Sequence, residues 1–263
     1  MCVLSKVDLR LAELVEQAET RNAIACAVSR GQLQGKPAEV RPFSSGYLVS
    51  ETPHEAAVVG AGRRGRLSPG EVAQMHRFLD RVVHLCPAIG ASLHHQLTEM
   101  GYRECDEMVV MACAPVARDV MHRPAIVVQP VHRSTRLTWA RTVTAGFAEV
   151  DEVPEGDATA GLVIADIPGV SCFLASDLSG EPLGGGAMVR YGRVAILFGD
   201  STLPKARGRG VQKELIRRRV LNATATNCEL ATALTAPGSA SQKNYERTGF
   251  KAAYTRVTLA SAA

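Results

Sequence analysis

The sequence predicts an α/β protein made of two similar units, and three observations support this prediction. Apolar residues recur at helical spacing in some segments and alternate with polar residues in others, so helices and short strands follow one another along the chain. A short helix, a glycine, an aromatic residue and an alternating strand occur twice in the same order, around Gly101 and Gly249. The 263 residues are enough for one large domain or two small ones.

The composition argues against several classes of protein. Hydrophobic residues make up 46% of the chain and charged residues 21%, which is typical of a globular protein and argues against extended disorder. No apolar stretch approaches the roughly 20 residues of a membrane span, and no signal-peptide core follows the first residues. The seven cysteines are scattered and contain no CxxC pair, which disfavours disulfides and zinc. We therefore expect a cytoplasmic protein with free thiols and no metal.

The first half of the chain contains three predicted helices. Ser5 and Asp8 have the spacing of a capping box at the start of the first helix. Ser68-Pro69 opens the second, because proline is favoured at the first helical position, and Gly101 ends the third. The predicted elements are a helix over residues 5–21, extended segments over 46–50 and 56–59, helices over 68–83 and 91–100, and a strand over 102–112.

The second half alternates more regularly between strands and helices. Turn signals at Ser179-Gly180 and Tyr191-Gly192 separate its central strands, and residues 151–160 form an acidic loop. The predicted strands cover residues 125–128, 161–165, 171–176, 184–191, 194–200, 229–235 and 250–259. The predicted helices cover residues 137–150, 211–222 and 239–248.

The two halves end in the same pattern. When Gly101-Tyr102 is laid on Gly249-Phe250, QLTEMGYRECDEMVVM falls on NYERTGFKAAYTRVTL at an offset of 148 residues. This self-similarity indicates a duplicated domain with a boundary near residue 130, and we predict domains over residues 1–130 and 131–263. A helix, a glycine and a strand also form a common junction in α/β proteins, so coincidence is the alternative explanation.

The segment over residues 202–215 is the most informative part of the chain. It follows a predicted strand, contains Gly208 and Gly210, and opens a helix. Glycines at such a turn let main-chain amides approach a ligand, and the helix N-terminus adds N–H donors and a positive dipole end, so the loop is suited to bind phosphate. The spacing fits neither the dinucleotide fingerprint nor the Walker loop, and a solvated basic turn is the alternative. The cations around the loop are Lys205, Arg207, Arg209 and Lys213.

Two motifs give this half of the chain a family resemblance. RGRGVQ at residues 207–212 resembles motif A of the GNAT acetyltransferase superfamily, Gln/Arg-x-x-Gly-x-Gly/Ala, except that Gln212 stands where the family has glycine or alanine. YERTGF at residues 245–250 is similar to the family's Tyr-Glu-x-x-Gly-Phe, and Ser241 occupies the small-residue position before it. The resemblance covers about residues 135–260.

The resemblance implies two GNAT-like units, each a mixed, largely antiparallel sheet flanked by helices. Residues 131–263 would form the acetyl-CoA-binding unit, and residues 1–130 a degenerate copy. Gly60 and Gly62 match the two loop glycines, but a longer segment separates them from the next helix, and Leu97 stands where Tyr245 does. Because an amide cradle needs the helix to begin at the glycines, we expect the first copy not to bind the cofactor and instead to shape the substrate cleft.

The resemblance also implies the site residues. The diphosphate of acetyl-CoA would bind main-chain amides of the loop, and pantetheine would pair with the exposed edge of the strand that ends near Ser201. Tyr245 stands at the family's acid position, and Asp200 is the carboxylate that we expect as the base. The expected cofactor-binding residues are Ser201, Thr202, Arg207, Gly208, Arg209, Gly210, Val211, Gln212, Lys213 and Asn244.

Each assignment has a structural alternative. Tyr245 is alternatively a tyrosine packed between helix and sheet, Asp200 a turn aspartate with water acting as the base, and Asn244 a solvent-facing residue. The three arginines at 217–219 fan over about 200° of a helix, so a solvated face is their default and at most two face the CoA 3′-phosphate. The acidic loop either attracts a cationic amine or stays in water.

The expected function is an acyl-CoA-dependent N-acetyltransferase. It would move an acetyl group from acetyl-CoA to a primary amine of a small molecule, as a monomer or homodimer, without a nucleic-acid or membrane partner. A non-catalytic acyl-CoA-binding sensor or scaffold is the alternative. A nucleic-acid contact through the basic loop is disfavoured, because the charge is confined to one turn and few aromatic residues are available for stacking.

Overall fold

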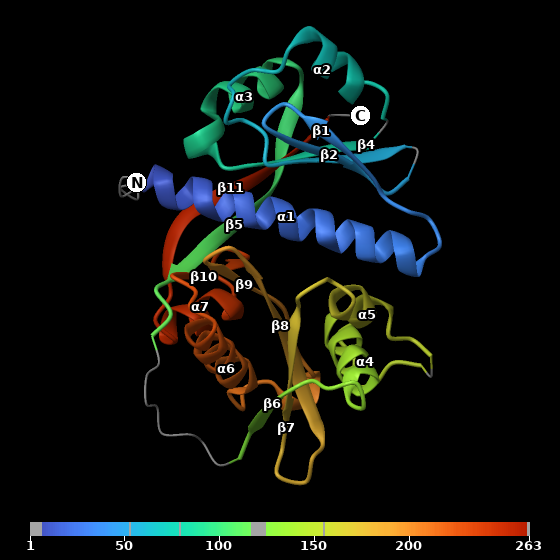
Figure 1. Ribbon diagram of the computed structural model, residues 1–263, viewed down its shortest axis with the longest axis vertical. Coiled ribbons are helices and arrows are strands. Elements are labelled where there is room, and N and C mark those ends of the chain that lie inside the picture. The colour runs from blue at the N-terminus through green and yellow to red at the C-terminus, as the bar shows by residue number, and fades with distance from the viewer. Residues whose placement is uncertain (1–6, 53, 79, 117–124, 155, 262–263) are drawn as a thin grey trace. The chain divides into compact units, whose positions relative to one another are not determined.

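The computed structural model describes residues 7–52, 54–78, 80–116, 125–154 and 156–261. These residues form two compact units (Figure 1). The first contains the described residues of Met1–Met111 and Ala252–Ala263 together with Leu234–Gly238, and the second contains those of Ala112–Ala233 together with Ser239–Lys251. The units therefore do not follow a single boundary near residue 130, because the last strand belongs to the first unit.

The first unit is a mixed sheet with three helices. Its strands lie in the order β1-β2-β3-β4-β11-β5. β3 and β4 are parallel, whereas β4 and β11 are antiparallel, with Val257 opposite Leu85. The elements are α1 (Leu9–Leu33), β1 (Glu39–Phe43), β2 (Gly46–Ser50), β3 (Glu55–Val59), α2 (Pro69–Met75), β4 (Asp80–Leu85), α3 (Pro87–Glu99), β5 (Tyr102–Cys113) and β11 (Lys251–Ser261).

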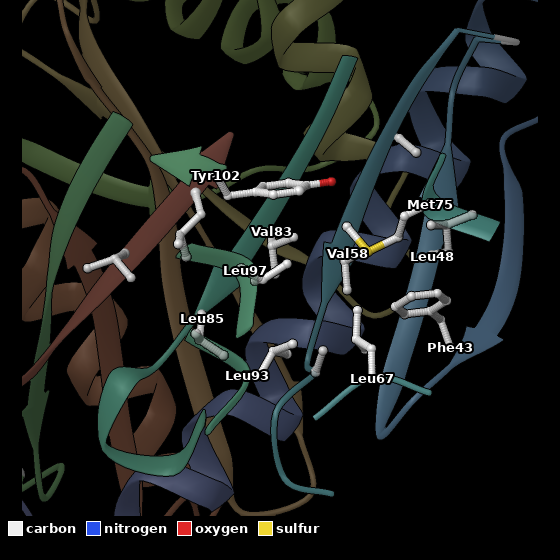
Figure 2. Close-up of a cluster of buried hydrophobic side chains, with 14 residues drawn as sticks. Phe43, Leu48, Val58, Leu67, Met75, Val83, Leu85, Leu93, Leu97 and Tyr102 are labelled. Atoms are coloured by element: carbon white, nitrogen blue, oxygen red, sulfur yellow. The ribbon is translucent and has the colours of Figure 1, made fainter. Parts of the chain in front are cut away.

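A cluster of buried apolar side chains forms the core of the first unit (Figure 2). Leu93 and Leu97 of α3 are fully buried and lie in this cluster with Val83 of β4. The last strand contributes Val257 and Leu259, which are 5% and 0% exposed. Each buried side chain of this size stabilises the fold by about 1.5–3 kcal/mol, which explains why β11 is an integral strand of this unit.

α1 starts later and ends later than the sequence predicts. Asp8 caps it, because its Oδ1 accepts the N–H groups of Arg10 at 3.0 Å and Leu11 at 3.2 Å. The predicted cap Ser5 lies outside the described residues. No helix within the described ranges is both long and apolar enough to cross a membrane.

The predicted helix over residues 68–83 is wrong beyond Met75. Its start is correct, since Ser68 caps α2 and Pro69 occupies the first turn. Residues Asp80–Leu85 instead form β4, which pairs with β3 on one side and with β11 on the other. Pairing with two strands stabilises this segment as a strand more than the helical spacing of its apolar residues favours a helix. A local sequence pattern reveals neither pairing, and β11 is also distant in sequence.

The second unit is also a mixed sheet, with helices on both faces. Its strands lie in the order β10-β9-β8-β7-β6, in which only the β9–β10 pair is parallel. The elements are β6 (Val127–Pro130), α4 (Arg136–Phe147), α5 (Thr159–Ala165), β7 (Ser171–Ser176), β8 (Pro182–Tyr191), β9 (Val194–Thr202), the 3₁₀ turn η1 (Pro204–Ala206), α6 (Val211–Ala225), β10 (Leu230–Thr235) and α7 (Ala240–Arg247).

Glycines in β8 let α4 and α6 approach the sheet from opposite faces (Figure 1). A Cβ at Gly185 would lie 2.6 Å from Trp139 Nε1 on α4, and a Cβ at Gly186 would lie 2.9 Å from Arg219 Cζ on α6. Successive residues of a strand face opposite sides, so the two large side chains occupy the space that these glycines leave. The GGG segment therefore has a packing role that brings Arg219 into the sheet.

The predicted strand over residues 161–165 is wrong, because these residues belong to α5. A Cβ at Gly161 would lie 2.2 Å from the carbonyl oxygen of Ala140, so α5 packs directly on α4. The Gly161 N–H donates to Thr144 Oγ1 at 3.0 Å. A short apolar run does not distinguish a buried helix from a strand, and here packing against α4 decides. The other elements predicted in this half form within three residues of their predicted ends.

Both copies of the repeated pattern have the predicted local structure. α3 is followed by Gly101 and β5, and α7 is followed by Gly249 and β11. Gly101 has φ 91° and Gly249 has φ 100°, the left-handed conformation that commonly ends a helix.

Candidate active site

The N-terminus of α6 is open and has no side-chain cap. Gly210 is its N-cap with φ 90°, and Gly208 has φ 76°. A Cβ at Gly208 would meet no atom within 4 Å, so this glycine is not required for packing. The N–H groups of the first helical turn lack intrahelical acceptors, and within the described residues the N-cap gives them no side-chain hydrogen bond. Gly208 therefore borders open space next to uncapped amides, and a Cβ at Gly210 would lie 3.6 Å from Lys213 Cε.

The loop is less positive than the sequence suggests. Lys205 Nζ lies 2.5 Å from Glu181 Oε1, and Arg207 Nη1 lies 2.6 Å from Glu149 Oε2. These pairs raise the pKa values of both cations, through hydrogen bonds to the carboxylates. All four side chains are well exposed, so each pair contributes little stability and is easily exchanged for another anion.

The edge of β9 that faces β10 is paired over only part of its length. Its ladder with β10 ends at Ile196, opposite Thr232. On its other edge a bulge places two residues of β9 opposite one of β8, and Gly199 in this bulge has φ 64°. Ser201 and Thr202 follow the bulge and pair with β8. The Ser201 hydroxyl is buried and donates to a main-chain carbonyl of α4, so only main-chain groups of Ser201 remain for a ligand.

Asp200, Arg219 and Tyr245 form a buried cluster below this edge. Arg219 forms an ion pair with Asp200, and its Nη1 also donates to the carbonyl oxygen of Ala187 at 3.1 Å. The Tyr245 hydroxyl donates to Asp200 Oδ2 at 2.6 Å. Arg219 is 0% exposed and Tyr245 is 1% exposed, whereas the Asp200 side chain is 15% exposed. The structure thus joins the two predicted catalytic residues to each other.

The contacts within this cluster affect the proton-transfer roles predicted for Tyr245 and Asp200. Burial, followed by the negative charge of Asp200, raises the pKa of Tyr245 well above its ordinary value. Its ring packs edge-on against Phe250 with centroids 4.9 Å apart. Tyr245 therefore keeps its proton, and both carboxylate oxygens of Asp200 already accept hydrogen bonds.

The expectation of a solvated arginine run is wrong for Arg219. Arg218 is exposed and Arg217 forms an ion pair with Glu214, but Arg219 is fully buried. The signal was present in the sequence, because Arg219 lies four residues after Leu215 on the apolar face of the helix. An arginine in an apolar stripe needs a buried anion, and that anion is not local.

Gln212 connects the start of α6 to α7. Its Nε2 donates to Ser241 Oγ at 2.9 Å, and its Oε1 accepts from Asn244 Nδ2 at 2.8 Å. Asn244 therefore faces α6 rather than bulk solvent. Gln212, the residue that departs from the motif pattern, therefore has two hydrogen-bond partners in the structure.

Comparison with known proteins identifies the fold. The sequence matches no protein-family model and no curated protein. A GCN5-related N-acetyltransferase from Kribbella flavida is similar in structure, with a TM-score of 0.64 and 16% identity over 91% of this chain and 96% of that one. A tandem GNAT protein from the clavulanic acid biosynthesis pathway has a TM-score of 0.55 and 14% identity over 85% of this chain and 78% of that one. A GCN5-related N-acetyltransferase from Sphaerobacter thermophilus has a TM-score of 0.55 and 14% identity, over 86% and 77%.

The chain has a GNAT fold. Within this GNAT fold the RGRGVQ segment runs from the turn after β9 into the start of α6. The YERTGF segment starts near the end of α7. Both motifs that carried the resemblance therefore lie in the second unit, on elements of the type that the sequence predicted.

In the first unit, the matching glycines do not border open space. Gly60 has φ 69° and Gly62 has φ 102°, so the loop shares the left-handed conformations of the second unit. A Cβ at Gly60, however, would lie 2.4 Å from Thr20 Oγ1 of α1, and a Cβ at Gly62 would lie 2.9 Å from the Cα of Gly90. The protein itself occupies the space over this loop.

The helix that follows this loop also satisfies its own amides. Ser68 and Glu71 form a capping box at α2, in which the Ser68 hydroxyl accepts the Glu71 N–H at 3.4 Å and Glu71 Oε2 accepts the Ser68 N–H at 2.7 Å. A carboxylate at this helix start also repels phosphate. These features support the expectation that the first unit does not bind the cofactor.

A cavity of about 570 Å³ lies within the second unit, between α4 and the β7–β8 hairpin. One wall is apolar, with Leu137, Val153 and Leu203, and the acidic segment contributes Asp151 and Glu152. The volume suits a small organic molecule. The cavity shares Leu203 and Lys205 with the segment that leads to the α6 loop.

Proposed function

We propose that this protein is an acyl-CoA-dependent N-acetyltransferase that acetylates a primary amine of a small molecule. The uncapped start of α6, with left-handed glycines at 208 and 210 and open space at Gly208, carries this proposal. Such a helix start binds diphosphate through its amides and its dipole. The GNAT fold supports the choice of acetyl-CoA as the donor.

The residues of the second unit fit this donor. Main-chain N–H groups from Gly208 to Lys213 are proposed to hold the diphosphate, and the exposed side chain of Arg209 adds positive charge. Arg207 can exchange its exposed partner Glu149 for a phosphate, because the present pair is weakly stabilising. The unpaired edge of β9 after Ile196 offers main-chain groups to the pantetheine amides. When bound, acetyl-CoA supplies the activated acyl thioester.

Residues of this chain are proposed to hold and move the protons. The Tyr245 hydroxyl stays protonated and donates its one proton to Asp200 Oδ2. Tyr245 is the proposed donor to the departing sulfur, and this role requires that the hydroxyl exchange Asp200 Oδ2 for the sulfur as its acceptor. Asp200 forms an ion pair with Arg219 and is proposed to orient Tyr245. Because both Asp200 oxygens are occupied, water is the better acceptor for the first proton of the ammonium group. A main-chain N–H on the β9 edge is proposed to polarise the carbonyl.

A non-catalytic acyl-CoA-binding protein is the second candidate. It is favoured by one observation, namely that the hydroxyl of Tyr245 is buried and already bonded to Asp200. In such a protein the cluster only stabilises the sheet. The amine acceptor of the enzyme is not specified by any motif, and a screen of amines with detection of the released thiol would find it.

Gly210→Glu is expected to weaken acetyl-CoA binding by about 100-fold or more, because a carboxylate would stand where the diphosphate binds. Isothermal titration calorimetry of the wild-type chain should show one site per chain, and the variant should show none. Gly192→Glu is the matched control, since Gly192 also has a positive φ, of 62°, and open surroundings. Two sites, or binding that survives Gly210→Glu, would mean that the cofactor site is assigned to the wrong place.

Tyr245→Phe is expected to lower turnover about 100-fold while acetyl-CoA affinity stays within about threefold of wild type. The substitution keeps the packing of the ring on Phe250 and removes only the hydroxyl group that carries the donated proton. Thiol release with the amine found by the screen measures turnover, and calorimetry measures affinity. Unchanged turnover would remove the acid role from Tyr245, and no turnover by the wild-type protein with any amine would favour the non-catalytic candidate.

A further inference from the structure

Gln212 breaks the motif pattern, yet its carboxamide is bonded at both ends. It lies at the second position of α6, where its amide N–H belongs to the uncapped first turn. The side chain points away from this turn, because Nε2 donates to Ser241 and Oε1 accepts from Asn244, both on α7. A large residue at this position is therefore compatible with an open cradle, since its side chain is held on the neighbouring helix.

α7 is a short helix that is mostly exposed or half-buried. It has only eight residues, and only Tyr245 among them is buried. Its start is capped by Ser239, whose hydroxyl accepts the N–H of Gln242 at 3.1 Å, but this contact is internal to the helix. Tyr245 anchors one face of the helix through Asp200. The contacts of Gln212 with Ser241, one helical turn before Tyr245, and with Asn244, next to Tyr245, provide a second anchor.

Two anchors on a short helix fix its rotation as well as its distance. The hydrogen bonds of Gln212 hold the side chain of Asn244 at a fixed place relative to the start of α6. The bond from Asn244 Nδ2 to Gln212 also sets the direction of the Asn244 carboxamide and leaves its Oδ1 for another donor. A pantetheine amide N–H is such a donor.

We propose that Gln212 is a positioning residue for acetyl-CoA, acting through Asn244 and α7. The inference rests on the proposed function and assigns a role to the residue at which this chain departs from the motif. For the effect of Gln212→Ala on cofactor binding, the proposal predicts the opposite of what the motif pattern predicts. The pattern treats a small residue at 212 as ideal, so Gln212→Ala should preserve or improve cofactor binding, whereas the bridging role requires that Gln212→Ala weaken it.

The first test needs no cofactor. Hydrogen exchange of the α7 amides, read by mass spectrometry on the full chain, should be about tenfold faster in Gln212→Ala, because two hydrogen bonds that hold the helix are lost. Gln212→Glu should restore wild-type exchange, since the Ser241 hydroxyl can donate to a carboxylate. Lys243→Ala, an exposed position on the same helix, is the control and should leave exchange unchanged. Unchanged exchange in Gln212→Ala would overturn the proposal.

The second test separates positioning from general damage to the loop. Acetyl-CoA and the phosphoadenosine diphosphate fragment of CoA are titrated into each variant by calorimetry. Gln212→Ala should raise the Kd of acetyl-CoA about tenfold and that of the fragment less than about twofold, because the fragment lacks the pantetheine that Asn244 is proposed to bind. Gln212→Ala and Asn244→Ala should be non-additive in acetyl-CoA affinity, since they remove one shared contact.

The outcomes distinguish this inference from the proposed function. If the wild-type chain binds neither acetyl-CoA nor the fragment, the proposed function is wrong. If the wild-type chain binds acetyl-CoA and Gln212→Ala binds it equally well or more tightly, only the role of Gln212 is wrong. Equal losses for acetyl-CoA and the fragment would also overturn it, because the damage would then lie in the phosphate loop.

Discussion

Replacing Arg219 by methionine is expected to destabilise the second unit by about 3–5 kcal/mol, because one partner of a buried ion pair is removed and the other is left behind. Asp200 would lose its ion pair and keep only the hydroxyl of Tyr245. The carbonyl oxygen of Ala187, which accepts from Arg219 at 3.1 Å, would also lose a donor. Methionine fills a similar volume, so the loss reports charge and hydrogen bonding rather than an empty space.

Urea unfolding followed by tryptophan fluorescence measures this effect. Trp139 is the only tryptophan of the chain and is fully buried in the second unit, so its signal follows that unit. Arg218→Met is the matched control, because Arg218 is the exposed neighbour on the same helix. The double variant Arg219→Met with Asp200→Asn should recover part of the loss, since no buried charge remains unpaired. A single variant as stable as the control would show that the cluster contributes nothing to stability.

Glu19→Gln is expected to remove a pH dependence from the stability of the first unit. Glu19 lies on the buried face of α1, is 5% exposed, and its Oε1 has no hydrogen-bond partner among the described residues. Burial raises its pKa from 4.5 to about 7, and the charge of Arg256 only partly opposes this while that of Glu16 adds to it. Between pH 4.5 and 7 the folded unit therefore binds more protons than the unfolded chain, so the contribution of Glu19 to stability falls as pH rises through this window.

The size of the effect follows from the difference between the folded and unfolded pKa values of Glu19. A tenfold change in proton affinity is worth about 1.36 kcal/mol, so the raised pKa corresponds to a loss on the order of 3 kcal/mol between pH 4 and pH 8. Glutamine has the shape of glutamate and no charge. Glu19→Gln should therefore be the more stable protein at pH 8 and should equal wild type near pH 4.

The comparison must be made as a difference between two proteins, because His84 in the same unit has the opposite dependence. Burial lowers the pKa of His84 to about 4, so its contribution to stability rises with pH between about 4 and 6.5. This contribution cancels when wild type and Glu19→Gln are compared at each pH. Native-state hydrogen exchange of α1 measures the free energy of opening, and Glu13→Gln, at an exposed position of the same helix, is the control. A constant difference between wild type and Glu19→Gln from pH 4 to pH 8 would contradict the assignment.

The buried polar face of α1 also explains why the first unit is unlike the second. Thr20 stands against Gly60, and Glu16 accepts a hydrogen bond from Tyr254 of β11 at 2.9 Å. The carboxyl end of β3, which precedes this loop, is covered by α1, whereas the loop after β9 borders open space. The sequence alignment identified the loop glycines but not the helix that covers them, because α1 lies about 40 residues earlier and carries no motif.

Several parts of the candidate site could be predicted from short stretches of sequence. Gly208 and Gly210 were expected to start a helix and leave its amides open, and α6 begins at Val211 as predicted. Ser239 caps α7, and Gly249 ends the junction after it with a positive φ. These features depend on the conformational freedom of glycine and on hydrogen bonds between residues three or four positions apart, so a single segment is enough to specify them.

The predicted fold is wrong in segments whose secondary structure depends on contacts with other elements of the chain. Residues 80–85 have apolar spacing that suits a helix, but β3 and β11 pair with them on both edges. Residues 161–165 are apolar enough for a strand, but Gly161 fits against Ala140 only as part of a helix. In both segments the local conformational preference is weak. The free energy gained by burying surface against a remote element is larger than that preference.

The sequence alone thus determined that the chain alternates helices and strands in two similar runs, and that the second run contains a glycine loop suited to phosphate. These properties follow from side-chain periodicity and from the backbone angles that glycine permits. Only the tertiary structure joined Asp200, Arg219 and Tyr245, turned Gln212 onto α7, and placed the last strand beside β4. Each of these contacts links residues at least 19 positions apart, and no local energy specifies them, because they depend on the order of the strands in the sheet.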